Sequence, residues 1–303
     1  MKLQRATFIG IRGVPDVSLD LTDARTGEPR SMVVITGPSG SGKTRMIEAL
    51  IAAKEAIRPY GALAAGAAWI GTTGAAKIRA AFYLDEAERD FAGTTSPTLE
   101  AEVIFLPDRA TAEADDGLRA VFGRYAHNPA YGKVDYFPAE RRIPMFPPFP
   151  GTGSAEQRVA RLGKDSRKYG FILPFLRTLG QDTAQRDRFA MTLAVLSPSC
   201  RYVPDPSGDV IPRCFSSNGG APATVAQLSH GEADAVIFAA TATLIGLDHS
   251  LVFVDRPDLF VDDLNLLLAG LTSLGKDNQL IITGRPELAT AAQGAHVVNL
   301  KGA

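Results

Sequence analysis

The sequence predicts an α/β protein with a parallel core sheet, a mixed β lobe and a small helical lobe. In the last third of the chain, buried apolar runs such as Leu251–Asp255 and Gln279–Thr283 alternate with helical stretches, which indicates a parallel sheet. Residues 32–36 form a similar apolar run, and a glycine-rich loop and a helical segment follow it. At the start, residues 6–11 and 17–21 alternate in polarity and predict an antiparallel pair of strands.

The composition is that of a folded protein with a sizeable core. The chain has 303 residues, of which 45% are hydrophobic and 21% charged, and its net charge of −1 excludes a globally basic nucleic-acid-binding surface. No apolar run approaches the roughly 20 residues of a membrane-spanning helix. The first residues have no apolar region of the kind found in secretory signals. We therefore expect a cytoplasmic protein that does not bind membranes.

The strongest motif is the segment Gly37–Thr44, which matches the phosphate-loop pattern G-x-x-x-x-G-K-[ST] in full, between a strand and a helix. Glycines let backbone N–H groups turn inward around phosphates, and the helix N-terminus adds the positive end of its dipole. We expect Lys43 to bridge the terminal phosphates and Thr44 to ligate Mg²⁺. The predicted cofactors are ATP and Mg²⁺. The residues expected to contact the nucleotide here are Gly37, Pro38, Ser39, Gly40, Ser41, Gly42, Lys43, Thr44 and Arg45.

A second motif opens a later helix with the residues Leu228, Ser229, His230, Gly231 and Glu232. Serine at a helix N-cap followed by glycine suits contact with an anion. The simpler alternative is a capping box, in which Ser229 caps the helix and Glu232 occupies the third helical position.

This second motif resembles the LSxGE signature of ABC-type ATPases, in the branch of the SMC and RecF heads and of the small ABC-like AAA ATPases of bacteria. The resemblance implies that Ser229, His230, Gly231 and Glu232 reach the γ-phosphate held by the phosphate loop of a second copy. The site would then be complete only in an ATP-dependent homodimer or higher oligomer.

Two further segments carry the same resemblance. The run Leu251–Asp255 and the residues after it resemble the Walker B stretch, in which Asp255 supports Mg²⁺ at the end of a buried strand. The strand Gln279–Thr283 and the following Gly-Arg-Pro-Glu-Leu resemble the segment that carries the switch histidine. Residues 136–141 resemble a "yfPaeR" segment of such heads. The similarity spans nearly the whole chain and predicts one compact domain without a coiled-coil arm.

The sequence departs from the family at the positions that support hydrolysis. Arg256 stands where the family has the glutamate that orients the attacking water, and a guanidinium does not accept a proton near neutral pH. Gly284 or Arg285 replaces the switch histidine, and no Q-loop glutamine stands in residues 70–82. Loss of a general base costs roughly 10²–10⁴-fold in rate. We therefore expect ATP binding with weak hydrolysis, with Lys43, Asp255 and Asp258 as the catalytic candidates.

Three functions remain open at this point. The first is a slow ATPase that uses Asp258, Glu232 or Glu287 as its base and drives a partner effector; the resemblance implies DNA repair or antiphage defence. The second is a non-hydrolysing, ATP-dependent assembly subunit. The third is a small-molecule kinase, because the phosphate loop alone does not exclude one. We divide the expected domain into an N-terminal lobe (1–153), a helical lobe (154–198) and a C-terminal core (199–303).

Three other stretches of the sequence allow predictions. Residues 154–177 hold six basic and two acidic side chains. Arg158, Arg161, Lys164 and Lys168 fall near one helical face, which indicates either a solvated face or a DNA- or RNA-binding surface. The Pro- and Gly-rich residues 143–154 read as a linker. Cys200 and Cys214 bracket an expected hairpin that would place them opposite each other, but two free thiols are the favoured reading in a reducing compartment.

Overall fold

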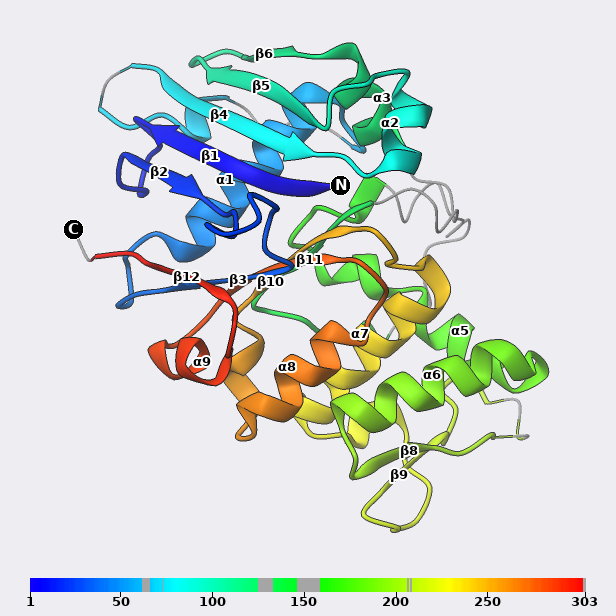
Figure 1. The fold of residues 1–303 in the computed structure, drawn as a ribbon. Helices are drawn as coiled ribbons and strands as arrows, with labels where there is room; N and C mark the ends of the chain where they lie inside the picture. The colour runs from blue at the N-terminus through cyan, green and yellow to red at the C-terminus, as the bar shows by residue number, and fades with distance from the viewer. Residues whose placement is uncertain are drawn as a thin grey trace.

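A computed structural model describes residues 1–61, 66–72, 74–124, 133–145, 159–205, 207 and 209–301. The described chain contains an antiparallel sheet, a parallel sheet and a two-stranded ribbon, and Figure 1 shows the antiparallel sheet stacked above the parallel one. Helices cover the far side of the parallel sheet. Among the described residues, no helix has the length and apolar character that crossing a membrane would require.

The antiparallel sheet has the strand order β2-β1-β4-β5-β6. The predicted pair of strands at the start of the chain is confirmed as β1 and β2, with Arg5 opposite Asp20. Strand β6 and helix α2 were not expected from the polar sequence around them, although Asp85 and Glu88 form a capping box that starts α2. The elements of this part are β1 (Lys2–Ile9), β2 (Val17–Asp20), β4 (Ala76–Tyr83), α2 (Glu86–Ala92), β5 (Thr98–Phe105), β6 (Ala110–Ala114) and α3 (Asp116–Gly123).

The parallel sheet has the strand order β12-β3-β11-β10-β7, and every neighbouring pair in it is parallel, as predicted. Every residue of β10 and β11 is buried, because helices and the other sheet cover both faces. Asp255 pairs with Thr283, so the carboxyl ends of these two strands lie level. The strands are β3 (Met32–Thr36), β7 (Val134–Phe137), β10 (Leu251–Asp255), β11 (Gln279–Thr283) and β12 (His296–Asn299).

Two hydrophobic cores lie on opposite faces of the parallel sheet. Because side chains alternate along a strand, Leu251 and Phe253 join the core shared with α1 (Lys43–Ile57), whereas Val252 and Val254 join the core shared with α7 (His230–Ile245). Helix α1 therefore fills the space between the two sheets (Figure 1). The helices of the second core are α5 (Ile172–Thr178), α6 (Thr183–Leu196), α7, α8 (Leu264–Thr272) and α9 (Pro286–Ala291).

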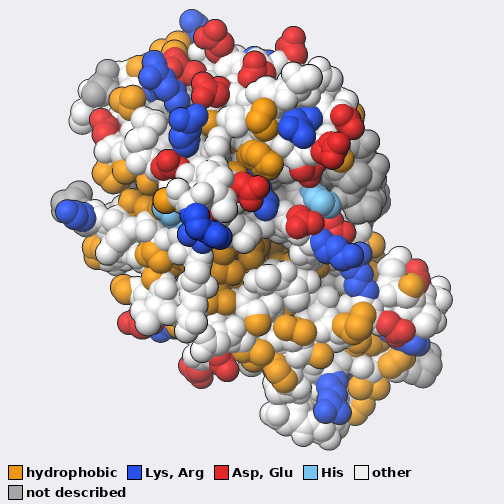
Figure 2. All heavy atoms as spheres, in the orientation of Figure 1, with side chains coloured by type: hydrophobic (Ala, Val, Ile, Leu, Met, Phe, Trp, Pro, Cys, Tyr) orange, Lys and Arg blue, Asp and Glu red, His pale blue; other side chains and the backbone are white. Residues whose placement is uncertain are grey.

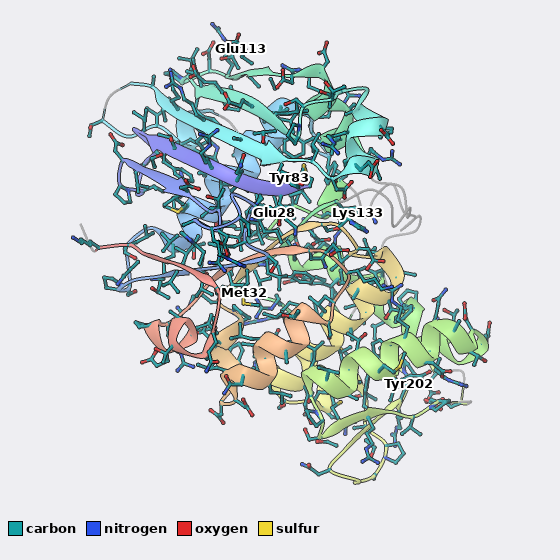
Figure 3. The ribbon with its side chains drawn as sticks, in the orientation of Figure 1. Glu28, Met32, Tyr83, Glu113, Lys133 and Tyr202 are labelled. Carbon is teal, nitrogen blue, oxygen red and sulfur yellow. The ribbon has the colours of Figure 1, made fainter. Side chains whose placement is uncertain are left out.

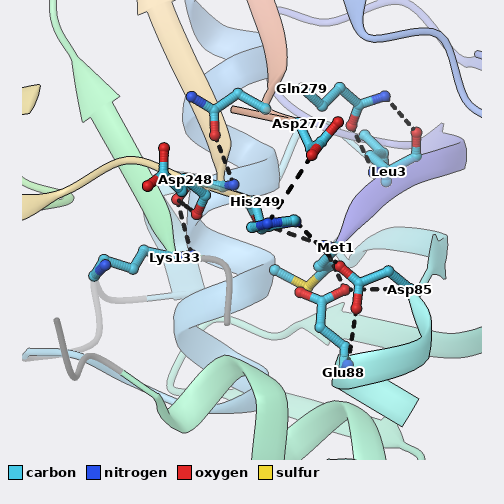
Figure 4. A network of polar contacts seen from close by, with 11 residues as sticks. Met1, Leu3, Asp85, Glu88, Lys133, Asp248, His249, Asp277 and Gln279 are labelled. Atoms are coloured by element: carbon cyan, nitrogen blue, oxygen red, sulfur yellow. Dashed lines mark hydrogen bonds and ion pairs between the residues drawn. The ribbon is translucent and has the colours of Figure 1, made fainter. Parts of the chain in front are cut away.

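Polar contacts join the first strand to its neighbours in both layers (Figure 4). The Gln279 side chain of β11 accepts a hydrogen bond from the Leu3 N–H at 2.6 Å and donates to the Leu3 carbonyl at 2.9 Å. The ammonium group of Met1 pairs with the buried Glu88 carboxylate at 2.5 Å. Burial raises the pKa of Glu88, and the nearby ammonium opposes this shift. These contacts hold the two sheets in a fixed relation.

The surface differs between the two ends of the molecule. Charged side chains gather over the antiparallel sheet, whereas apolar side chains are more common over the helices at the other end (Figure 2). Glu113 on β6 marks the first end, and Tyr202 in the β8–β9 ribbon marks the other (Figure 3). In that ribbon, β8 (Cys200–Tyr202) pairs with β9 (Phe215–Ser217).

The ribbon corrects the expected register of the two cysteines. Cys200 pairs with Ser217 and not with Cys214, so the register of the ribbon differs by three residues from the expected one. Both thiols are free and buried, and burial raises the pKa of each to about 12. The favoured reading of two free thiols therefore agrees with the structure.

Candidate functional site

A cavity of about 740 Å³ opens beside the glycine-rich loop and the carboxyl ends of β10 and β11. Its lining includes five cationic side chains and no acidic one among the described residues. Three of the cations come from outside the glycine-rich loop (residues 37–45), namely Arg12, Arg256 and Arg285. The other two are Lys43 and Arg45. Such a cavity is suited to a ligand that carries several negative charges.

The loop reaches its shape through glycines that other residues could not replace. Gly42 has φ of 91°, and a Cβ at this position would overlap the carbonyl oxygen of Gly13. Gly37 has φ of 146°, and a Cβ there would overlap the carbonyl oxygen of Leu300. The loop is therefore wedged between two distant parts of the chain, which fixes where its N–H groups point.

Eight of the nine loop residues expected to contact the nucleotide line the cavity, and Ser41 does not. Its side chain is buried beneath the loop, where its hydroxyl would lie 2.8 Å from a Cβ at Gly37. Lys43 donates from Nζ to the carbonyl oxygens of Gly37 (2.8 Å) and Pro38 (2.7 Å), which holds the ammonium group over the loop. Burial and the Arg256 guanidinium lower the pKa of Lys43, while Asp255 and Asp258 oppose the shift.

Arg45 lines the cavity but is already engaged by the protein. It donates to the carbonyl oxygens of Ala68 and Arg12, the latter from Nε at 3.2 Å, and its guanidinium lies 4.1 Å from the Trp69 ring centroid. It therefore closes one side of the cavity by joining α1 to the segments around Arg12 and Ala68.

Thr44 and Asp255 form the part of the site that suits a divalent cation. The Thr44 hydroxyl donates to Asp255 Oδ1 at 3.0 Å, and the Thr283 hydroxyl donates to the same oxygen. Asp255 is buried at the end of β10, so its negative charge calls for compensation. A hydroxyl and a carboxylate are hard oxygen ligands of the kind Mg²⁺ takes alongside substrate phosphates. These residues therefore fit the predicted metal.

A buried arginine behind β10 helps to hold Asp255 in place, and the sequence did not predict this role. Arg141 donates to the Asp255 carbonyl oxygen at 2.9 Å and pairs with the Asp234 carboxylate of α7. It thereby connects the end of β10 to α7. The segment 136–141 was noticed only through its resemblance, and nothing local to it indicates Asp234 as the partner.

Asp258, a catalytic candidate, does not line the cavity. Its side chain is 1% exposed, and Oδ2 accepts hydrogen bonds from the Arg285 backbone N–H (2.9 Å) and Nε (3.0 Å). Arg256 adopts a left-handed backbone with φ of 47° and lines the cavity itself. The end of the parallel sheet thus presents two guanidinium groups toward the loop, with a carboxylate behind one of them.

None of the four signature residues lines the cavity of its own chain. Ser229 and His230 are exposed at the start of α7, and the predicted capping box is present. The Ser229 hydroxyl lies 2.9 Å from Glu232 Oε2, and Ser217 donates to Glu232 Oε1 at 2.5 Å. Burial raises the pKa of Glu232, but these hydrogen bonds outweigh it and leave the pKa below its usual value. The His230 ring stacks on Phe260 at 4.8 Å.

The expected basic face at residues 158–177 is not formed. Arg161 is fully buried in a bidentate pair with Asp135 (2.8 and 2.7 Å), and Lys168 is buried with Nζ bonded to three carbonyl oxygens. Lys164 pairs with Glu48, and Arg167 pairs with Asp165. The sequence pattern failed because these residues do not share one regular helix. Arg158 and residues 146–154 of the expected linker lie outside the described residues.

The chain has the fold of SMC head domains, which agrees with the predicted fold class. No protein-family model and no curated protein matches the sequence. Among solved structures, the chain is similar to an SMC head bound to the C-winged helix domain of ScpA, with a TM-score of 0.60 and 14% identity over 96% of this chain and 93% of that one. It is also similar to the SMC head domain from Thermotoga maritima, with a TM-score of 0.53 and 15% identity over 97% and 93%.

Proposed function

We propose that the chain binds ATP with Mg²⁺ in the cationic cavity and acts as a nucleotide-gated engine or scaffold. The observation that carries this proposal is the cavity itself, where a full phosphate-loop motif lies among five cationic side chains and, within the described part of the chain, no carboxylate. The fold of SMC heads agrees with this proposal. No observation favours a small-molecule kinase, because the exposed tip of α7, formed by residues 229–232, would have no role in it.

The residues of the chain divide the work of holding the nucleotide. Loop N–H groups and Lys43 bind the phosphates, and Lys43 moves from its carbonyl partners to the terminal oxygens. Thr44 and Asp255 hold Mg²⁺, which neutralises charge on the phosphates when bound. Arg141 keeps the end of β10 in place behind Asp255.

Hydrolysis is proposed to be slow. Arg256 lines the cavity where a water-orienting carboxylate would be needed, and a guanidinium does not take a proton from water at neutral pH. The same observation favours a second candidate function, a subunit that assembles on ATP without turnover. Glu232 is held by Ser217 and Ser229, which makes it a poor base in the separate chain.

We further propose that two copies of the chain associate around ATP. The start of α7 would face the phosphates bound by the other copy, because its exposed groups lie outside the cavity of their own chain. A partner effector in DNA repair or antiphage defence would respond to this association. One SMC head of the same fold is bound to a domain of ScpA, which supports the expectation of a protein partner.

The direct test is ATP binding by calorimetry together with steady-state phosphate release. Lys43→Ala removes charge-assisted hydrogen bonds, and we expect it to weaken ATP binding by about 100-fold. Lys276→Ala, at an exposed lysine, is the matched control and should bind normally. Phosphate release by the unaltered chain supports the ATPase if Lys43→Ala abolishes it. Tight ATP binding without phosphate release supports the assembly subunit. Absence of ATP binding by the unaltered chain would contradict both.

A further inference from the structure

Arg285, which lines the cavity, is held by hydrogen bonds to Asp258. Arg285 makes three hydrogen bonds to this one residue: from its backbone N–H and Nε to Oδ2, and from Nη2 to the Asp258 carbonyl oxygen at 3.1 Å. A guanidinium held at two of its nitrogens and at its own backbone has little freedom to turn. Its side chain is nevertheless 50% exposed and lines the cavity.

The surroundings of the pair are closely fitted. Gly284 precedes Arg285, and a Cβ there would lie 2.5 Å from Leu288 Cδ2 and 3.4 Å from Asp258 Cγ. The Asp258 carboxylate is fully buried, and its Oδ1 atom has no hydrogen-bond partner within the described chain. A buried carboxylate is costly unless a cation compensates it, so Asp258 holds Arg285 strongly.

The pair lies on the side of the cavity where the terminal phosphate is expected. Thr283 donates to Asp255 at the proposed metal position, and Arg285 follows Thr283 by two residues. Mg²⁺ bridges the β- and γ-phosphates in phosphate-loop proteins. Arg12, Arg45 and Ala68 also line the cavity. If Mg²⁺ is held at Asp255, the γ-phosphate would therefore be expected near the end of β11.

Resting on the proposed function, we propose that Arg285 recognises the terminal phosphate and makes the cavity prefer nucleoside triphosphates over diphosphates. Asp258 is then a positioning residue that orients Arg285, and it is not the general base. Its Oδ2 already accepts two hydrogen bonds, and the carboxylate does not line the cavity. Arg256, which has no acidic partner among the described residues, supplies a second positive charge beside the same phosphate.

The test compares the affinities for ATP and ADP across four variants. Arg285→Ala should weaken ATP binding by about tenfold and leave ADP binding nearly unchanged, because it removes one charge-assisted contact. Arg285→Lys should fall between, since it keeps the charge without the planar fork. Asp258→Asn should lower the preference for ATP by a smaller factor. Arg109→Ala, at an exposed arginine paired with Asp108, is the control and should change neither affinity.

A double-variant cycle tests whether Asp258 acts through Arg285. In the Arg285→Ala background, Asp258→Asn should cause no further change in the ratio of the two affinities. Circular dichroism at each step confirms that the variants are folded. An equal loss of ATP and ADP affinity in Arg285→Ala would overturn this inference alone. Asp258→Asn that abolishes phosphate release with an unchanged affinity ratio would also overturn it. An unaltered chain that binds neither nucleotide would overturn the proposed function as well.

Discussion

The two surfaces proposed to meet at the nucleotide are built in different ways. The loop side is assembled from distant segments, since Gly42 packs against Gly13, Gly37 against Leu300 and Thr44 against Asp255. The tip of α7 is built locally, by a capping box within four residues and one hydrogen bond from Ser217. The loop side forms a cationic cavity, whereas the α7 tip is exposed and lines none of it.

This difference suggests how the two surfaces divide their tasks. A surface that depends on the whole fold can position a triphosphate accurately within one chain. A surface that satisfies its own polar groups keeps its shape in solution and can dock onto a second chain without refolding. Changes at the loop should therefore affect the nucleotide affinity of the separate chain, while changes at the α7 tip should affect association and leave that affinity unchanged.

The largest effect is expected at Gly42. Gly42→Ala places a Cβ against the Gly13 carbonyl at a left-handed position, so we expect a lower melting temperature and loss of detectable ATP binding. Gly40→Ala is the matched control, because Gly40 is also left-handed with φ of 82° but has open space around it. It should cost only about 1–2 kcal/mol of stability, the cost of placing an L-residue in a left-handed conformation. Equal effects of the two changes would contradict the wedged loop.

An intermediate effect is expected at Gly231. A Cβ at this position would lie 2.8 Å from the Phe260 carbonyl oxygen, so Gly231→Ala should shift the α7 tip. We expect association in the presence of ATP to weaken by about tenfold, equivalent to about 1.4 kcal/mol. The ATP affinity of the separate chain should stay unchanged. Sedimentation with and without ATP measures the association. An equal loss of ATP affinity in the separate chain would contradict the separate roles of the two surfaces.

The smallest effect is expected at Glu232. Hydrogen bonds keep its pKa below the usual value in the folded chain, so its charged form stabilises the fold above the pKa of the unfolded state. That contribution is lost as the pH falls through the folded-state pKa. Urea unfolding at pH 7 and pH 3 should show Glu232→Gln to be less stable than the unaltered chain only at pH 7. An equal difference in stability at pH 7 and pH 3 would show that the charge of Glu232 does not cause the effect.

Much of the parallel sheet could be predicted because its strands are continuous apolar runs. The bounds of β10 and β11 agree with the expected ranges, and the phosphate loop was recognisable from its own residues. Strand β6 has only small and polar residues and gives a weak signal. The remaining parts of the site depend on contacts between distant segments. Arg12, Arg141 and Asp234 carry no local pattern that indicates their partners.

The basic residues 158–177 show that a clear local pattern can also mislead when distant residues decide the structure. The positive charges of these residues suggested an exposed surface. Instead, Arg161 is buried in an ion pair with Asp135 of β7, and Lys168 is buried with hydrogen bonds to three carbonyl oxygens. Periodicity assumed one helix, and the chain makes short turns there instead. Burial of a cation depends on its partners, which a local pattern does not reveal.

A cross-linking experiment tests most directly whether one copy completes the site of another. Ser39 in the loop and Ser229 at the α7 tip are exposed, and both native thiols are buried with pKa values raised to about 12. The double variant Ser39→Cys and Ser229→Cys should therefore react selectively with a short thiol cross-linker. We predict a cross-linked dimer with ATP and Mg²⁺, and none with ADP or after Lys43→Ala. Cross-linking that ignores the nucleotide, or its absence with ATP, would contradict the account.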